Sequence, residues 1–209
     1  MTPLQRYEQD LQSSDFSRDE AQAEAVAQLQ RVFDALVGRQ QKRDRRSNFL
    51  RRISFRNDES VHGLYMWGGV GRGKTYLMDV FYDSLPFDNK IRTHFHRFMR
   101  GVHKQLANLS GEKNPLKLVA ADIAKRAQVI CFDEFFVSDI SDAMILAGLF
   151  EELFRRGIVL VATSNIEPDG LYKDGLQRVR FLPAIEQLKK CTVVMNVDGG
   201  TDYRLRTLE

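Results

Sequence analysis

The hydrophobic positions of this chain form short apolar runs separated by segments with a helical period. The apolar and alternating runs predict five β-strands, at 61–67, 90–96, 128–132, 158–163 and 192–197. The helical periods predict helices at 74–85, 97–109, 115–126 and 140–155, and a helical region at 168–190. Because strands and helices alternate, we expect an α/β fold with a parallel five-stranded sheet and helices on both faces.

The first part of the chain carries a helix followed by a strongly basic stretch. A helix is predicted from Ser17 to Gly38, because Ser17 and Glu20 form a capping-box pattern and glycine commonly ends helices. Residues 39–56 contain eight Lys or Arg and a single acid. Two interpretations of 39–56 remain open: a solvated loop, or a basic arm that contacts an acidic partner, a membrane surface or nucleic acid. The sequence therefore predicts two parts: an N-terminal helix with a basic loop at 1–60, and the α/β core at 61–209.

Composition narrows the class of protein. The chain has 209 residues, of which 43% are hydrophobic, enough for a sizeable core, and its net charge of +3 does not by itself indicate nucleic acid or membrane. It has no apolar run of about 18 residues, and its polar N-terminus fits neither a signal nor a transit peptide, so we expect a cytoplasmic protein. Cys131 and Cys191 are predicted to be buried thiols in strands, without a disulfide framework.

The most informative motif follows the first predicted strand and opens the next helix. It fits the pattern G-x-x-x-x-G-K-[ST], whose glycines let successive N–H groups converge on an anion at a helix start. Its lysine is expected to contact the β- and γ-phosphates of a nucleotide, and its threonine to bind Mg²⁺. The motif comprises Gly68, Gly69, Val70, Gly71, Arg72, Gly73, Lys74 and Thr75.

Acidic and amide side chains follow two further strands. Asp133 and Glu134 end the apolar run at 128–132, which predicts that Asp133 holds Mg²⁺ and that Glu134 orients or deprotonates an attacking water. Asn165 follows the run at 158–163 and is expected to hold that water near the γ-phosphate. In a parallel sheet such residues meet at the carboxyl edge, where ligands bind.

A second possibility for a metal lies in the strand predicted at 90–96. There, His94 and His96 would share one face at a spacing that some metal sites use. Because no carboxylate or cysteine nearby in the sequence completes a ligand set, this interpretation is weaker than the Mg²⁺ site at Asp133.

The ordered set of phosphate loop, Asp-Glu pair and Asn is the pattern of AAA+ P-loop ATPases, and within them the chain resembles the ZapE (Afg-one-like) family. The resemblance implies an AAA+ core that binds ATP and Mg²⁺, and cellular work on the FtsZ ring or another protein client. Relatives continue beyond the last strand into a helical lid, which the resemblance implies is missing here. The matching blocks are 63–75, 93–99, 131–140, 162–165 and 175–183.

The resemblance also implies residues that sequence spacing alone does not reveal. An arginine finger, given by one subunit to the ATP of its neighbour, is assigned first to Arg178 and second to Arg180, so self-association is expected through Arg178. Arg204 is similar to an arginine that contacts nucleotide in helicase loaders. Gln22 is either a contact to the adenine or an exposed helical glutamine.

These observations lead to a Mg²⁺-dependent ATP hydrolase that remodels a protein partner, in the family's case at the division site. The alternative is a helicase-loader-like protein that grips single-stranded nucleic acid, which the modest net charge and the lack of an aromatic stacking platform do not favour. Salt-dependent DNA binding would distinguish the two.

Overall fold

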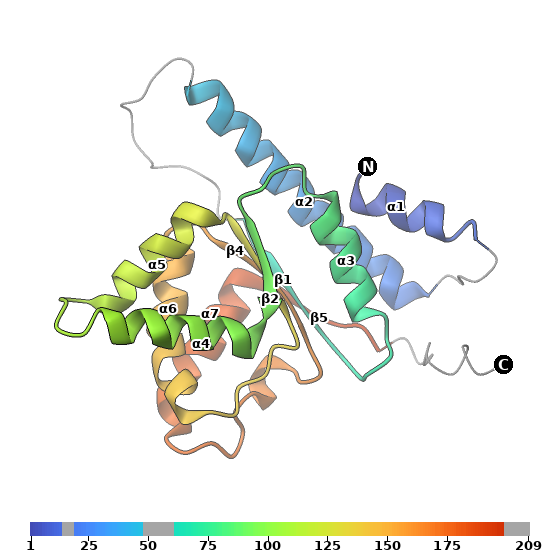
Figure 1. The fold of residues 1–209 in the computed structure, drawn as a ribbon. Helices are drawn as coiled ribbons and strands as arrows, with labels where there is room; N and C mark the ends of the chain where they lie inside the picture. The colour runs from blue at the N-terminus through green and yellow to red at the C-terminus, as the bar shows by residue number, and fades with distance from the viewer. Residues whose placement is uncertain (14–18, 48–60, 199–209) are drawn as a thin grey trace.

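The protein is described by a computed structural model, which covers residues 1–13, 19–47 and 61–198 (Figure 1). Its helices and strands alternate from the first strand onwards. In chain order they are α1 Pro3–Asp10, α2 Glu20–Ser47, β1 Gly63–Trp67, α3 Lys74–Ser84, β2 Lys90–His94, α4 Phe95–Asn108, α5 Pro115–Arg126, β3 Val129–Asp133, α6 Ile140–Arg155, β4 Val159–Ser164, the 3-10 turns η1 Pro168–Gly170 and η2 Arg178–Arg180, α7 Leu182–Cys191 and β5 Thr192–Asn196.

The strands form one parallel sheet in the order β2-β3-β4-β1-β5, which confirms the predicted architecture. Strand β4 lies between β3 and β1, although β1 comes first along the chain. Neighbouring strands end at nearly the same level, since His94 pairs with Asp133 and Trp67 pairs with Ser164. The carboxyl ends of β1, β2, β3 and β4 therefore meet along one edge of the sheet.

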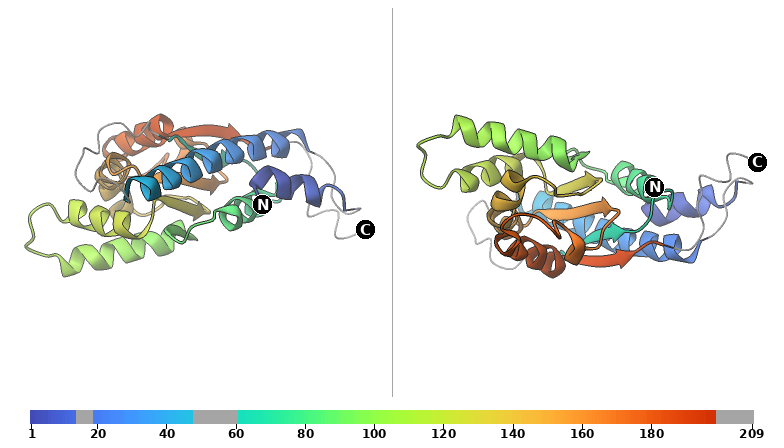
Figure 2. Two further views of the ribbon diagram at one scale, coloured as in Figure 1. Left: turned by 90° about the horizontal axis from the view of Figure 1, so that it is seen from above. Right: turned by 90° about the horizontal axis from the view of Figure 1, so that it is seen from below.

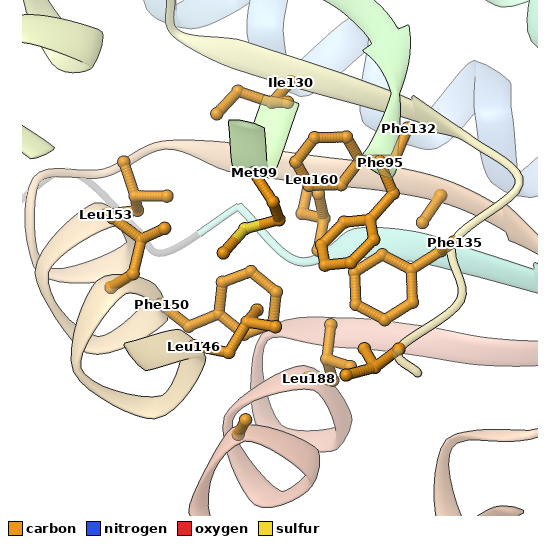
Figure 3. Close-up of a cluster of buried hydrophobic side chains, with 14 of the residues drawn as sticks. Phe95, Met99, Ile130, Phe132, Phe135, Leu146, Phe150, Leu153, Leu160 and Leu188 are labelled. Carbon is orange, nitrogen blue, oxygen red and sulfur yellow. The ribbon is translucent and has the colours of Figure 1, made fainter. Parts of the chain in front are cut away.

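Alternate residues of each strand face two separate apolar layers. On one face, Leu64, Val129 and Val161 pack with buried residues of α1, α2 and α3, and on the other face Tyr65 and the large cluster in Figure 3 pack against α4 to α7. The views from above and below show the sheet between these two sets of helices (Figure 2). Because both faces are covered, the middle strands are apolar throughout, as expected for a parallel sheet.

The N-terminal helices differ from the prediction in two ways. Helix α1 was not predicted, although Thr2 and Gln5 form a capping box and a proline stands in the first turn. Helix α2 continues through Gly38 to Ser47, so the prediction of a loop beginning at residue 39 is wrong for 39–47. Arg39 Nη1 donates to the carbonyl of Gly157 at 2.7 Å, a contact that ties the helix beyond Gly38 to the turn between α6 and β4.

The segment between β4 and α7 is also different from the prediction. The expected helical region at 168–190 consists of two short 3-10 turns, and an α-helix begins only at Leu182. Gln177 adopts a left-handed conformation, with φ of 57°, and a residue in that conformation interrupts a right-handed helix. The carbonyl groups at 168 and 178 are instead used in tight turns.

Three smaller differences concern element ends. Strand β2 ends at His94, and α4 begins at Phe95, so the strand predicted to reach residue 96 is too long. Cys131 is buried in β3 as expected, but Cys191 is the partly buried last residue of α7 and not a strand residue. Helix α2 begins at Glu20, where Asp19 Oδ1 accepts from the Gln22 N–H, while Ser17 lies outside the described residues.

None of the described helices combines the length and the apolar character that crossing a membrane requires.

Candidate active site

The phosphate loop, residues 68–75, connects β1 to α3 at the carboxyl edge of the sheet (Figure 1). Gly71 and Gly73 have φ of 83° and 78°, in the left-handed region that glycine enters without strain. Gly73 also caps α3, and it has no side chain that could accept a hydrogen bond from the first turn. The positive end of α3 is therefore open to an anion.

Lys74 and Thr75 begin α3. The Lys74 Nζ donates to the carbonyl oxygens of Gly68 and Gly69, both at 2.6 Å, so the ammonium folds back over the loop. Burial lowers the pKa of Lys74 below its ordinary value; Asp198 opposes that change and Arg72 reinforces it. Thr75 is exposed in the first turn, where its hydroxyl is accessible to a ligand.

The side chain of Gln22, in α2, is hydrogen-bonded to the phosphate loop. Its side chain is 1% exposed, so the interpretation of an exposed helical glutamine is wrong, and its Nε2 donates to the carbonyl of Arg72 at 3.3 Å. A Cβ on Gly73 would lie 2.6 Å from that nitrogen. Gln22 Oε1 and Arg72 Nη1 are buried without a hydrogen-bond partner in the described part of the chain, which leaves an acceptor and a donor beside the loop.

Asp198 approaches the loop from the other side, just after β5. Its Oδ1 accepts from the Gly69 N–H at 2.8 Å and from Arg72 Nε at 3.0 Å. Sequence reasoning missed this residue, since it lies 129 positions from Gly69 and belongs to no recognised motif. A strand that pairs with β1 was the one available signal, because it brings its own carboxyl end beside the loop.

Asp133 and Glu134 lie at the end of β3 in contrasting environments. Asp133 is 17% exposed, and both its oxygens accept from Arg92 of β2, at 2.9 Å from Nε and 3.3 Å from Nη2. Glu134 has φ of 53°, and its side chain is 80% exposed, 3.9 Å from the ring of His94. The structure therefore separates the two acids: one is held by a guanidinium, and the other projects into solvent.

Arg92 also donates to Asp79 of α3, so one guanidinium serves two carboxylates. Burial disfavours its charge, but the hydrogen bonds to Asp133 and Asp79 outweigh that effect and raise the pKa of Arg92 above its ordinary value. Sequence reasoning missed both Arg92 and Asp79.

Two side chains at the end of β4 form hydrogen bonds with the segment that follows β3. Thr163 Oγ1 accepts from the Glu134 N–H at 3.2 Å, and Ser164 Oγ donates to the carbonyl of Phe135 at 2.8 Å. Both side chains are buried, whereas the next residue, Asn165, is exposed at the same edge. The strand order places Asn165 between the ends of β1 and β3, while its expected role with water stays a prediction.

The two candidate finger residues lie on the other face of the sheet from the phosphate-loop helix. Arg178 and Arg180 form the turn η2, which contacts α6 on the face opposite to α3. Arg178 Nη2 donates to the carbonyl of Asp169 at 2.6 Å, and Arg180 Nη1 donates to the side chain of Gln177. Their roles stay predictions, and Arg204 lies outside the described residues.

Two other interpretations of the sequence concern the pair His94 and His96 and the basic stretch 39–56. The rings of His94 and His96 stack with centroids 5.8 Å apart, and no group of three or more metal-ligating side chains occurs at 1–13, 19–47 or 61–198. Of the basic stretch 39–56, residues 48–60 lie outside the described part, so its suggested contacts stay predictions.

The oxygen groups at the edge fit a magnesium ion. Mg²⁺ prefers oxygen ligands, of which Thr75 offers a hydroxyl and Asp133 a carboxylate. A carboxylate has about four lone-pair positions. Since Arg92 takes one on each oxygen of Asp133, positions remain for waters of a hydrated cation.

The strand order and the phosphate loop after β1 define a P-loop nucleotide-binding fold of the AAA+ type. The chain belongs to the AFG1-like ATPase family, whose model matches residues 1–209. It is 52% identical over 215 residues to the cell division protein ZapE of Escherichia coli K12, in an alignment that covers all of this chain and 57% of that protein.

Two solved structures show the same fold at low sequence identity. The structure of DnaI has a TM-score of 0.53 and 17% identity, covering 80% of this chain and 85% of that one. The DnaC helicase loader has a TM-score of 0.51 and 12% identity, with 87% and 92% covered. At these identities the likeness concerns the fold alone.

Proposed function

We propose that this chain is a Mg²⁺-dependent ATP hydrolase. The observation that carries the proposal is the strand order, which brings the phosphate loop, Asn165 and the pair Asp133 and Glu134 to one edge of the sheet in that sequence. Family membership supports the same activity.

In this proposal the phosphate loop and the polar residues at the strand ends have separate roles. Lys74 and the N–H groups at the start of α3 bind the phosphates, while Thr75 and Asp133 hold Mg²⁺, which would offset the negative charge of the phosphates. Glu134 accepts a proton from the attacking water, and Asn165 orients that water. Glu134 suits its role because its carboxylate is exposed and its backbone is fixed by Thr163.

The test is phosphate release from ATP, measured with and without a chelator of divalent cations. We expect release that stops on chelation and resumes when MgCl₂ is added in excess. Release that continues unchanged under chelation would contradict the magnesium role, and the absence of release at every protein concentration would contradict hydrolysis.

At a finer level, we propose that turnover remodels a protein client in the cytoplasm, with the FtsZ ring as the client that the family resemblance suggests. The 52% identity to a cell division protein supports this assignment. We propose that Arg178 serves the ATP of a neighbouring subunit, and the position of η2 on the face opposite to α3 supports this role.

This finer proposal predicts a rate per subunit that rises with protein concentration and increases further with FtsZ. The Arg178→Ala variant should lose the dependence on concentration, and the same loss in Arg180→Ala alone would assign the finger to Arg180, the second candidate. A rate per subunit that is constant in both variants and in the wild type would contradict catalysis between subunits.

A further inference from the structure

Arg92 lies between two carboxylates, those of Asp79 and Asp133. Asp133 follows Val129 and Cys131 on the face of β3 that packs against α3, so its side chain is directed toward that helix. Asp79 lies four residues after Thr75, and residues at this spacing share one side of a helix. The guanidinium bridges Asp79 and Asp133, and Asp79 lies one helical turn after the threonine proposed to bind magnesium.

The charges of this group are not balanced. One guanidinium faces two carboxylates, and Arg92 and Asp133 are only 20% and 17% exposed. Without Arg92, two acids would remain close together on the surface that receives the metal. Two carboxylates that face one another bind divalent cations, since their oxygens match the preference of Mg²⁺ and Mn²⁺.

We propose that Arg92 is a positioning residue that keeps a free divalent cation out of the Asp79–Asp133 pair, so that the metal enters together with nucleotide. Arg92 aims the Asp133 carboxylate with two hydrogen bonds and leaves its outer lone pairs for metal-bound water. The inference rests on the proposed magnesium role of Asp133.

The experiment compares the thermal unfolding of the nucleotide-free chain in KCl with that in MgCl₂ or MnCl₂ at equal ionic strength. We expect no specific effect of the divalent salts on the wild type. Arg92→Gln should unfold at a lower temperature in KCl and recover several degrees in either divalent salt. Titration of Mn²⁺ alone should show binding at least about tenfold tighter than to the wild type.

A pair of double variants identifies the carboxylates involved. Arg92→Gln with Asp79→Asn should lose the metal effect, whereas Arg92→Gln with Asp83→Asn should keep it. Asp83 is the matched control, because it lies on the same helix with 52% of its side chain exposed, against 50% for Asp79.

Each outcome decides the proposal. Equal stabilisation of the wild type and Arg92→Gln by divalent salts would overturn it, as would a metal effect that Asp79→Asn leaves intact or that Asp83→Asn also removes. If Arg92→Gln is unfolded in KCl, the proposal requires MgCl₂ or MnCl₂ to restore its folding. Because these tests use metal without nucleotide, a negative result would not argue against ATP hydrolysis. Equally, a finding that the chain does not hydrolyse ATP would not change how these tests are interpreted.

Discussion

The phosphate loop and the strand-end carboxylates are two halves of one candidate site, but the chain holds them in different ways. In the loop, backbone conformation is set locally by Gly71 and Gly73, whose left-handed φ values open the start of α3. At the end of β3, Asp133 and Glu134 are set by side chains of neighbouring strands, Arg92 and Thr163. The glycine conformations of the loop are therefore local to eight residues, although Gln22 and Asp198 contact it from distant segments. The positions of Asp133 and Glu134 depend throughout on contacts between separate strands.

The comparison predicts that substitutions in the two halves have separable effects. The largest effect on binding is expected for Lys74→Ala. Loss of about two charge-assisted hydrogen bonds to phosphate, each worth about 1.5–3 kcal/mol, should weaken ATP binding at least about 100-fold. Calorimetric titration with a non-hydrolysable ATP analogue measures the change.

Lys189→Ala is the control for that substitution, since Lys189 pairs with Asp169 and not with the loop. It should bind the analogue as the wild type does. An unchanged affinity in Lys74→Ala would remove the assignment of the loop to phosphate.

A smaller effect on turnover is expected for Thr163→Val, at the strand ends that carry Asp133 and Glu134. The variant keeps the shape of the side chain but leaves the Glu134 N–H without its acceptor, at a cost of about 1–3 kcal/mol in the free energy of unfolding. Displacement of Glu134 should lower turnover about tenfold while the affinity for ATP stays close to that of the wild type.

Thr93→Val serves as the comparison, because the Thr93 hydroxyl donates only to the carbonyl of the next residue, at 3.3 Å. Steady-state phosphate release and chemical denaturation of both variants give the two quantities. A loss of ATP affinity in Thr163→Val as large as its loss of turnover would show that the halves are not separable.

The smallest effect is expected for Asp198→Asn. Its amide oxygen still accepts from the Gly69 N–H, but a negative charge beside the phosphates is removed, so ATP should bind about two- to fivefold more tightly. Binding titrations at low and high salt measure this gain, which should shrink as salt rises. A weaker affinity would mean that the charge of Asp198 is needed to shape the loop.

The same contrast explains what the sequence could predict. The glycine pattern of 68–75 and the apolar strands ending at Asp133 and Asn165 are local signals, so the fold and the order of the edge were predictable. Arg92 and Asp198 act through contacts that span 41 and 129 positions, which no local pattern reveals.

The errors in element boundaries also have physical causes. Helix α2 passes through Gly38 because a single glycine weakens a helix by only about 1 kcal/mol, and Arg39 beyond it contacts the Gly157 carbonyl. The helix expected at 168–190 is an α-helix only from Leu182, because Tyr172 and Gln177 adopt left-handed conformations that could not be read from their residue types. Helix α1, by contrast, had a readable signal in Thr2 and Gln5, which form its capping box.

The most direct test of ATP hydrolysis at this edge is a paired measurement on Glu134→Gln: affinity for ATP with Mg²⁺, and phosphate release at saturating ATP, on the same preparation. Removal of the proposed proton acceptor should lower turnover at least about 100-fold, while affinity remains within about threefold of the wild type. Turnover at the wild-type rate would contradict the assignment of Glu134 and, with it, the division of the site into a binding half and a hydrolytic half.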